Sequence, residues 1–249
     1  DDATIHSSVQ NAIDASWAKP FPLPEPQVDL DAYFARIGYD GPREATLEVL
    51  RDLHALHPAH IPFEAINVLC RKGVSLAPED IDRKIILEGR GGYCFEQNGL
   101  FRRVLRSLGF EVESLAGRVL WGYNEGDGPR PRCHMAMRVT LDGEAWLVDV
   151  GLGGCVPTAP LLLGVSVPQV TPHDTFRVRE RNGRYLTELE RDGVWKPVHE
   201  VDIVPVEDID YEVMNFYAST HPESGFAKVL MVARSAPHAR FTLLNNRLT

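Results

Sequence analysis

The spacing of apolar residues predicts that the first part of the chain is mainly helical. Leucines recur at every third position over residues 43–60, which is the spacing of one face of a helix, and Pro58 is predicted to stop this helix. Similar patterns predict helices over residues 29–38 and 78–89, and another that begins at Cys94. Residues 1–27, which include KPFPLPEP, are expected to form a proline-rich lead-in.

After Gly109 the pattern changes to the alternation that is typical of strands. The dipeptides Asp142-Gly143, Asn182-Gly183 and Asp192-Gly193 each separate two such runs and predict β-hairpins. Residues 110–200 are therefore expected to form an antiparallel sheet or a small barrel. The remaining tail is predicted to contain a helix, an irregular loop and a strand.

Composition narrows the class of protein. The chain has 249 residues, of which 44% are hydrophobic and 24% are charged, a balance typical of soluble globular proteins. No apolar run is long enough to cross a bilayer, and the acidic start DDATIHSSVQ has no secretory-signal pattern. The formal net charge of -9 opposes non-specific binding of nucleic acid.

The cysteines favour a reducing compartment. The 4 cysteines show no CxxC pair, so a zinc knuckle is not expected. A metal role for His54, His57 and His60 is the alternative to their ordinary interpretation, and no metal site is assigned. A chain of this size with so few cysteines does not resemble a disulfide framework, which favours the cytoplasm.

Cys94 stands out because RGGYC precedes the predicted helix directly. The N–H groups at a helix start favour negative charge, and therefore the thiolate form of a cysteine. The glycines allow unusual backbone or close approach of another group. The stretch by itself leaves two interpretations open, a nucleophile or a buried small hydrophobic residue.

A thiolate nucleophile needs an imidazole and a group that orients it. His134 begins the first strand of a predicted hairpin, and Asp149 ends the second. Folding about Asp142-Gly143 places His134 near Gly151 and Asp149 opposite Ala136, so the two side chains are diagonal neighbours on one face. The alternative is a core histidine with an unrelated aspartate at the end of a strand.

The other histidines have ordinary interpretations. His54, His57 and His60 are read as residues at or beyond a helix C-terminus, where partial positive charge suits the helix dipole. His199 falls in the group that is read as polar or turn-like.

The segments RGGYCFE, CHMAMRV, WLVDVGLGG, STHPES and IPFEAINV resemble signature segments of the arylamine N-acetyltransferases, over about residue 28 to the end. The resemblance implies an α+β fold with a papain- or transglutaminase-like cysteine core. Its expected parts are a helical subdomain over residues 1–109, a central antiparallel β-barrel over 110–204, and a C-terminal α/β lid over 205–249 that is shorter than in relatives.

The resemblance also implies a function. Cys94 would take an acetyl group from acetyl-CoA and pass it to an arylamine or hydrazine, with His134 and Asp149 completing the triad. Acetyl-CoA is expected as a cosubstrate, and no bound cofactor is expected. No nucleic-acid or membrane partner is expected. The protein is expected in the cytoplasm, with a role in xenobiotic metabolism.

Further residues follow from the same resemblance. Glu64 and Arg90 are expected to brace the nucleophile loop, or else to form a surface ion pair of little energy. The other expected residues are Phe63, Tyr93, Gly151, Leu152 and Gly153 at the acceptor pocket, and Thr220 and Ser224 at CoA. Many relatives carry Phe where this chain has Leu152, which is expected to widen the pocket.

Two other functions use the same residues. A papain- or transglutaminase-like hydrolase could employ the triad with water as the acceptor. A non-catalytic relative could bind CoA alone.

Overall fold

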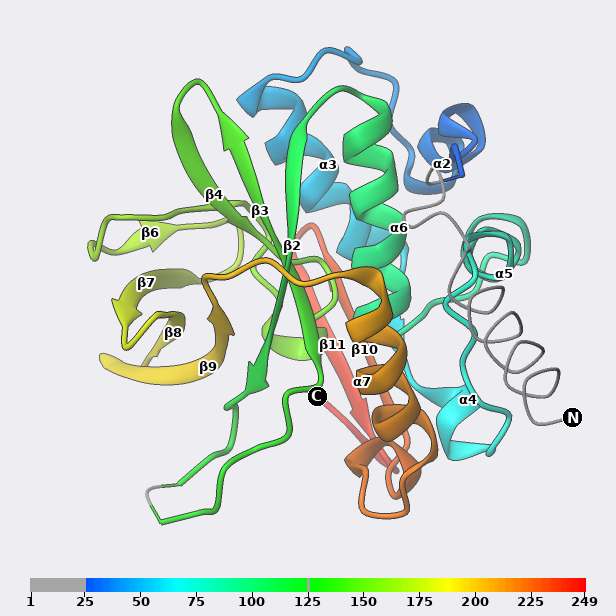
Figure 1. Ribbon diagram of the computed structural model, residues 1–249, viewed down its shortest axis with the longest axis vertical. Helices are drawn as coiled ribbons and strands as arrows, with labels where there is room; N and C mark the ends of the chain where they lie inside the picture. Colours follow the sequence, from blue (N-terminus) through cyan, green and yellow to red (C-terminus); the bar gives the residue numbers. More distant parts are fainter. Residues whose placement is uncertain (1–25, 125) are drawn as a thin grey trace, which may run out of the picture.

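The computed structural model describes residues 26–124 and 126–249 (Figure 1). The expected proline-rich lead-in over residues 1–27 therefore lies almost wholly outside the described residues. The helical elements of the first part are α2 (Leu30–Ile37), α3 (Leu47–His60), α4 (Ile66–Leu69), α5 (Pro78–Asp82), a π-helical turn (Arg83–Leu87) and α6 (Cys94–Ser107). A two-residue strand, β1 (Phe63–Glu64), lies between α3 and α4.

Pro58 does not stop α3, contrary to the prediction. The helix continues to His60, and the backbone N–H of Ile61 donates to the carbonyl of His57. Proline removes one N–H donor and crowds the carbonyl four residues earlier, but it does not prevent the later N–H groups from bonding, so the helix closes with the bond from Ile61 to His57.

The second part of the described chain forms an eight-stranded antiparallel sheet in the order β5-β4-β3-β2-β9-β8-β7-β6. Its strands are β2 (Glu111–Val119), β3 (His134–Leu141), β4 (Glu144–Val148), β5 (Leu161–Leu162), β6 (Gln169–Val170), β7 (Thr175–Arg181), β8 (Arg184–Arg191) and β9 (Val194–Asp202). The side-chain amide of Gln169 in β6 exchanges two hydrogen bonds with the backbone of Leu162 in β5. The two edge strands therefore meet, which closes most of a barrel and confirms the predicted α+β fold with its antiparallel barrel.

The three predicted hairpins are confirmed. Asp142 and Gly143, for example, both have positive φ (52° and 79°), as a tight two-residue hairpin turn requires. In the pairing of β3 with β4, Met137 lies opposite Val148. Extending this register by one residue places Asp149, just beyond β4, opposite Ala136, as predicted.

The C-terminal segment differs from the prediction of a single strand. It contains α7 (Asp208–Thr220), a 3₁₀ turn (Gly225–Ala227), β10 (Met231–Ala236), β11 (Ala239–Leu244) and β12 (Arg247–Leu248). β10 pairs with β1, so Ala233 lies opposite Phe63 and a second sheet runs β1-β10-β11-β12. We keep the three-part division after residues 109 and 204 as a proposal.

The core lies between the helices and the barrel, with α6 packed beside β2 and β3 (Figure 1). Leu100, Phe101 and Leu105 of α6 are fully buried in one cluster with Met137 and Val139 of β3. This packing brings the start of α6 to the N-terminal end of β3. Within residues 26–124 and 126–249, no helix has the length and apolar character that a membrane span requires.

Candidate active site

Cys94 is the first residue of α6 and is 3% exposed. The glycines before it are explained by close packing of the chain against itself. A Cβ on Gly91 would lie 2.0 Å from the carbonyl oxygen of Pro62, and one on Gly92 would lie 2.9 Å from Cβ of Glu96. Neither position has room for a side chain, so the loop before Cys94 can approach β1 and the first turn of α6 only with glycine there.

A buried ionic network holds the start of α6. The Glu96 carboxylate accepts a hydrogen bond from the Tyr93 backbone N–H (3.0 Å), which caps the helix. Its other oxygen accepts from Nζ of Lys84 at 2.7 Å. Burial raises the pKa of Glu96, while the charge of Lys84 and its hydrogen bond oppose that rise. Both side chains are less than a tenth exposed, so this pair is shielded from water.

Glu64 and Arg90 belong to the same network. Arg90 Nη2 lies 2.9 Å from Glu64 Oε1, and Lys84 Nζ lies 3.5 Å from the same oxygen. Glu64 is 4% exposed and also accepts from the Ile66 N–H. The pair therefore joins a buried carboxylate to an arginine that is 36% exposed, so it is partly buried rather than a surface ion pair. Its bracing role is a proposal. Lys84 and Glu96 were missed because nothing in the local spacing pairs the 78–89 segment with α6.

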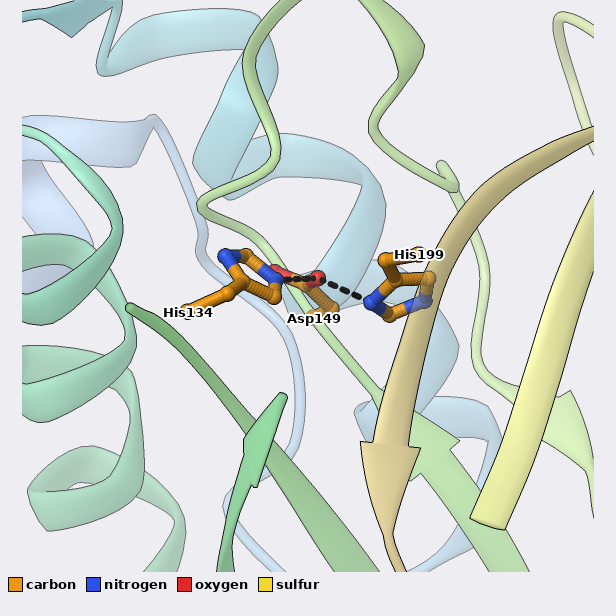
Figure 2. A group of neighbouring side chains, drawn as sticks. All are labelled: His134, Asp149 and His199. Carbon is orange, nitrogen blue, oxygen red and sulfur yellow. Dashed lines mark hydrogen bonds and ion pairs between the residues drawn. The ribbon is translucent and has the colours of Figure 1, made fainter. Parts of the chain in front are cut away.

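The structure brings Cys94, His134 and Asp149 together. His134 Nε2 lies 2.6 Å from Asp149 Oδ2, and both side chains are 1% exposed (Figure 2). Cys94 Sγ lies 3.8 Å from the carbonyl oxygen of Cys133, the residue before His134.

The charges of His134 and Asp149 depend on each other. Burial alone would lower the pKa of His134, but the charge of Asp149 and the hydrogen bonds with Asp149 and Cys94 raise it well above its ordinary value. Burial would raise the pKa of Asp149, but the charge and hydrogen bond of His134 lower it. The arrangement therefore favours a charged imidazolium–carboxylate pair next to the thiol.

Asn98 of α6 orients the carboxylate from the opposite side. Its Nδ2 donates to Asp149 Oδ1 (2.9 Å) and to the carbonyl of Met135 (2.7 Å), and its Oδ1 accepts from Val150 N–H (2.9 Å). Gly151 N–H also donates to Asp149 Oδ1 at 2.9 Å. Asn98 lies one helical turn after Cys94, so the i, i+4 spacing in CFEQN is the signal that could have identified it.

The interpretation of His54 and His57 as positively charged residues at a helix end is wrong. Both are fully buried, and burial lowers their pKa values to about 4 and about 3. His54 Nε2 accepts a hydrogen bond from the backbone N–H of Asp149 at 3.2 Å, and His57 Nδ1 is bonded to the Tyr33 hydroxyl. The two side chains are neutral parts of the core, and His54 supports the strand end that carries Asp149.

The polar or turn-like interpretation of His199 is also wrong. His199 lies in β9, is fully buried, and its Nδ1 is 3.7 Å from Asp149 Oδ2 (Figure 2). Burial lowers its pKa to about 4. The pairing of β8 with β9 shifts register between Thr187 and Glu188, so that Val198 and His199 are both buried. This irregularity breaks the strand alternation that sequence reasoning depends on.

His134, Asp149 and His199 also have the composition of a metal site, since one ligand atom from each lies within 4.8 Å of the others. The distance of 2.6 Å between His134 Nε2 and Asp149 Oδ2 is a hydrogen-bond distance. Two ligands of one tetrahedral ion at bond lengths of about 2.0 to 2.1 Å stand more than about 3 Å apart. We therefore describe the group as a hydrogen-bonded carboxylate.

Some of the residues expected at the acceptor pocket lie close together, and one does not. The rings of Phe63 and Tyr93 both contact Phe226, with centroid distances of 6.0 and 5.7 Å, and an added Cβ on Gly153 would lie 3.6 Å from Phe63. Leu152 packs instead against the core of the barrel. Phe226 was missed because it lies in the 3₁₀ turn after α7, in a segment for which the sequence predicted only an irregular loop.

The other expected residues of the acceptor pocket and the CoA site, Gly151, Thr220 and Ser224, make close contacts within the protein. A Cβ on Gly151 would lie 2.8 Å from Cα of Cys94, so this loop packs directly against Cys94. Ser224 is 5% exposed and donates its hydroxyl to the carbonyl of Ala218 (2.6 Å), while Thr220 is exposed and donates to the carbonyl of Phe216. Both hydroxyls thus bond to the last turns of α7.

Comparisons with known proteins agree on one family. The profile of the family described as "N-acetyltransferase" matches residues 46–249. An arylamine N-acetyltransferase of Escherichia coli (strain K12) is 37% identical over 221 residues, which are 88% of this chain and 78% of that protein. One of Mycobacterium tuberculosis (strain H37Rv) is 40% identical over 220 residues, 87% of this chain and 77% of that protein.

Solved structures show the same similarity. The arylamine N-acetyltransferase structure from M. tuberculosis has a TM-score of 0.86 and 38% identity, and covers 88% of this chain and 83% of that one. The Mycobacterium marinum enzyme in complex with CoA has a TM-score of 0.86 and 37% identity, with 88% of this chain and 82% of that chain covered.

Proposed function

Because the chain belongs to the N-acetyltransferase family, we propose that it transfers an acetyl group from acetyl-CoA to an arylamine or hydrazine through an acetyl-Cys94 intermediate. The observation that carries this proposal is the contact of Cys94, at the start of α6, with the hydrogen-bonded pair His134 and Asp149. The same proposal covers a cytoplasmic role in the metabolism of foreign amines, which the free cysteines support.

In the first half-reaction the Cys94 thiolate attacks the thioester carbon of acetyl-CoA. The carbonyl oxygen becomes an oxyanion, which the backbone N–H of Cys94 can stabilise because N–H groups in the first turn of a helix have no intrahelical acceptor. The C–S bond to CoA then breaks, and the CoA sulfur takes the proton from His134. One thioester replaces another, so little free energy separates reactants from products.

In the second half-reaction the amine nitrogen attacks the acetyl carbon on Cys94. His134, now neutral, accepts the proton that the amine loses, and the Cys94 sulfur leaves as the thiolate. Asp149 holds Nε2 of the ring, which leaves Nδ1 available to Cys94 and to the substrates. The products are the acetylated amine and the original thiolate–imidazolium pair.

Binding of the two substrates is proposed at neighbouring positions. Phe63, Tyr93 and the loop from Gly151 to Gly153 would line the acceptor side. Because Leu152 packs against the core of the barrel, it would leave more room on that side than a larger aromatic residue would. Thr220 and Ser224 would adjoin CoA, and the neighbouring Phe226 supports this because it contacts Phe63 and Tyr93. Glu64 and Arg90 would brace the loop before Cys94.

Acetyl-CoA alone tests the proposal. We expect one acetyl group per chain on Cys94, detected by intact-protein and peptide mass spectrometry, and discharge of this group when an arylamine is added. The variant Cys94→Ala should remain folded by circular dichroism, take up no acetyl group and make no acetylated amine. Cys70→Ala, at an exposed cysteine, is the matched control and should react normally. Continuous CoA release without amine would instead identify a hydrolase, and a chain that binds CoA without acetylation would identify a non-catalytic relative.

A further inference from the structure

His199 is a buried imidazole without hydrogen bonds. Its exposed fraction is 0%, and neither ring nitrogen has a hydrogen-bond partner among the residues that the structure describes. Burying an imidazole without hydrogen bonds destabilises the folded state, and nearly all buried polar groups in proteins are paired. The position of His199 therefore calls for a reason other than stability.

The surroundings of Asp149 supply that reason. A carboxylate has about four acceptor positions. Oδ1 of Asp149 accepts from Asn98 and Gly151, and Oδ2 accepts from His134. Nδ1 of His199 faces Oδ2 from the other side of the carboxylate, at 3.7 Å (Figure 2). His199 thus occupies the side of Asp149 that the three hydrogen bonds leave open.

We propose that His199 is a positioning residue that acts through Asp149: its Nδ1–H dipole stabilises the carboxylate charge and so keeps His134 able to release its proton when Cys94 is acetylated. The proposal rests on the proposed function. The separation of 3.7 Å makes the contact electrostatic rather than a hydrogen bond, and such a dipole is felt strongly because the site contains little water.

The need for this dipole changes during the reaction. In the proposed mechanism, the His134 imidazolium before acetylation lies beside two anions, the Cys94 thiolate and the Asp149 carboxylate, and stabilises both. After acetylation, the sulfur is neutral, and the second half-reaction requires His134 to be neutral as well. The buried charge of Asp149 then has no cationic partner, and it is stabilised by dipoles: the Nε2–H of neutral His134, together with those of Asn98, Gly151 and His199.

The titratable groups around His134 come from four elements. Cys94 of α6, Asp149 after β4 and His199 of β9 face the ring, Cys133 precedes it in the chain, and His54 of α3 contacts the backbone of Asp149. Removing the His199 dipole leaves the Asp149 charge less compensated, which favours the protonated form of His134. The amine step depends on the neutral form, so its acid limb should move to higher pH.

The experiment measures each half-reaction against pH in the variants His199→Leu and His199→Asn. Leucine removes the dipole, whereas the amide nitrogen of asparagine is three bonds from Cα, as Nδ1 of histidine is. Thr187→Val is the matched control, because Thr187 lies opposite His199 on β8 and its buried hydroxyl also lacks a partner among the described residues. Stopped-flow CoA release reports acetylation, and discharge of preformed acetyl-enzyme by an arylamine reports the second step.

For His199→Leu we expect the acid limb of the discharge step to move up by about half a pH unit or more, a shift typical of losing one electrostatic partner. Acetylation should change less. The limbs of His199→Asn and Thr187→Val should stay at the wild-type pH.

An unshifted or lowered limb in His199→Leu, with rates reduced equally at all pH values, would overturn the proposal and leave His199 with a packing role. A shift of the same size in His199→Asn or Thr187→Val would also overturn it. If His199→Leu does not fold, His199→Phe takes its place, because phenylalanine keeps a ring but has no N–H dipole: a limb moved to higher pH supports the proposal, and a wild-type limb refutes it. Failure of wild-type protein to form acetyl-Cys94 would refute the proposed function instead, so the two failures are distinguishable.

Discussion

Replacing Lys84 by methionine tests whether the buried ionic network holds the start of α6, which carries Cys94, in place. Methionine keeps most of the length of the side chain and removes its charge. The Lys84 ammonium lies 2.7 Å from Glu96 Oε1 and 3.5 Å from Glu64 Oε1, and all three side chains are less than a tenth exposed. In Lys84→Met, Glu64 keeps Arg90 as a partner, whereas Glu96 keeps, among the residues that the structure describes, the hydrogen bond from the Tyr93 N–H.

The expected cost follows from that loss. Removing one partner of a buried ion pair typically lowers the free energy of unfolding by about 3 to 5 kcal/mol, because the other charge stays buried. Arg83→Met is the matched control in the adjacent position. Arg83 is 60% exposed and pairs with Asp80, and such surface pairs contribute about 0 to 1 kcal/mol.

The pH dependence identifies the cause. Burial already raises the pKa of Glu96 against the opposing charge of Lys84, so removing Lys84 raises it further. A carboxyl group with a raised pKa in the folded state binds more protons there than in the unfolded chain. The stability lost in Lys84→Met should therefore be greatest at neutral pH and should shrink as the pH falls toward 5.

Urea unfolding followed by circular dichroism at pH 7 and pH 5 measures these effects. The double variant Lys84→Met with Glu96→Gln should recover about half of the loss or more, because glutamine is neutral and its oxygen can still accept from the Tyr93 N–H. A loss no larger than that of Arg83→Met, or one that is equal at both pH values, would refute the reasoning.

Two further predictions concern Asp149 and the buried histidines. Asp149→Asn should lower the rate of acetyl transfer by about three to four orders of magnitude, since the amide no longer holds His134 in the required tautomer, and near-normal kcat/KM for acetyl-CoA and an arylamine would remove Asp149 from the mechanism. His54, His57 and His199 have folded-state pKa values of about 4, 3 and 4, below the unfolded value of 6.5. The unfolded chain therefore binds more protons than the folded protein between these values, and stability should fall as the pH drops from 6.5 toward 4, by up to about 1.4 kcal/mol per pH unit for each histidine. Urea midpoints that do not change between pH 7 and pH 5 would contradict this.

The amino-acid sequence by itself determined the features that depend on neighbouring residues. The hairpin about Asp142-Gly143 sets the register that places Asp149 opposite Ala136, two residues from His134 and on the same face, because turn chemistry and strand alternation act over a few residues. The start of α6 at Cys94 follows from the apolar stripe behind it and the two glycines before it.

Tertiary structure alone decided which distant groups surround these residues. Lys84 meets Glu96, and His199 faces Asp149, only because packing brings separate elements into contact. The bulge between β8 and β9 turns His199 inward against the strand alternation, and β10 pairs with β1 across most of the chain length. Such contacts depend on how the whole core is packed. The spacing of residues within one segment does not show which distant residue will lie against it in the folded protein.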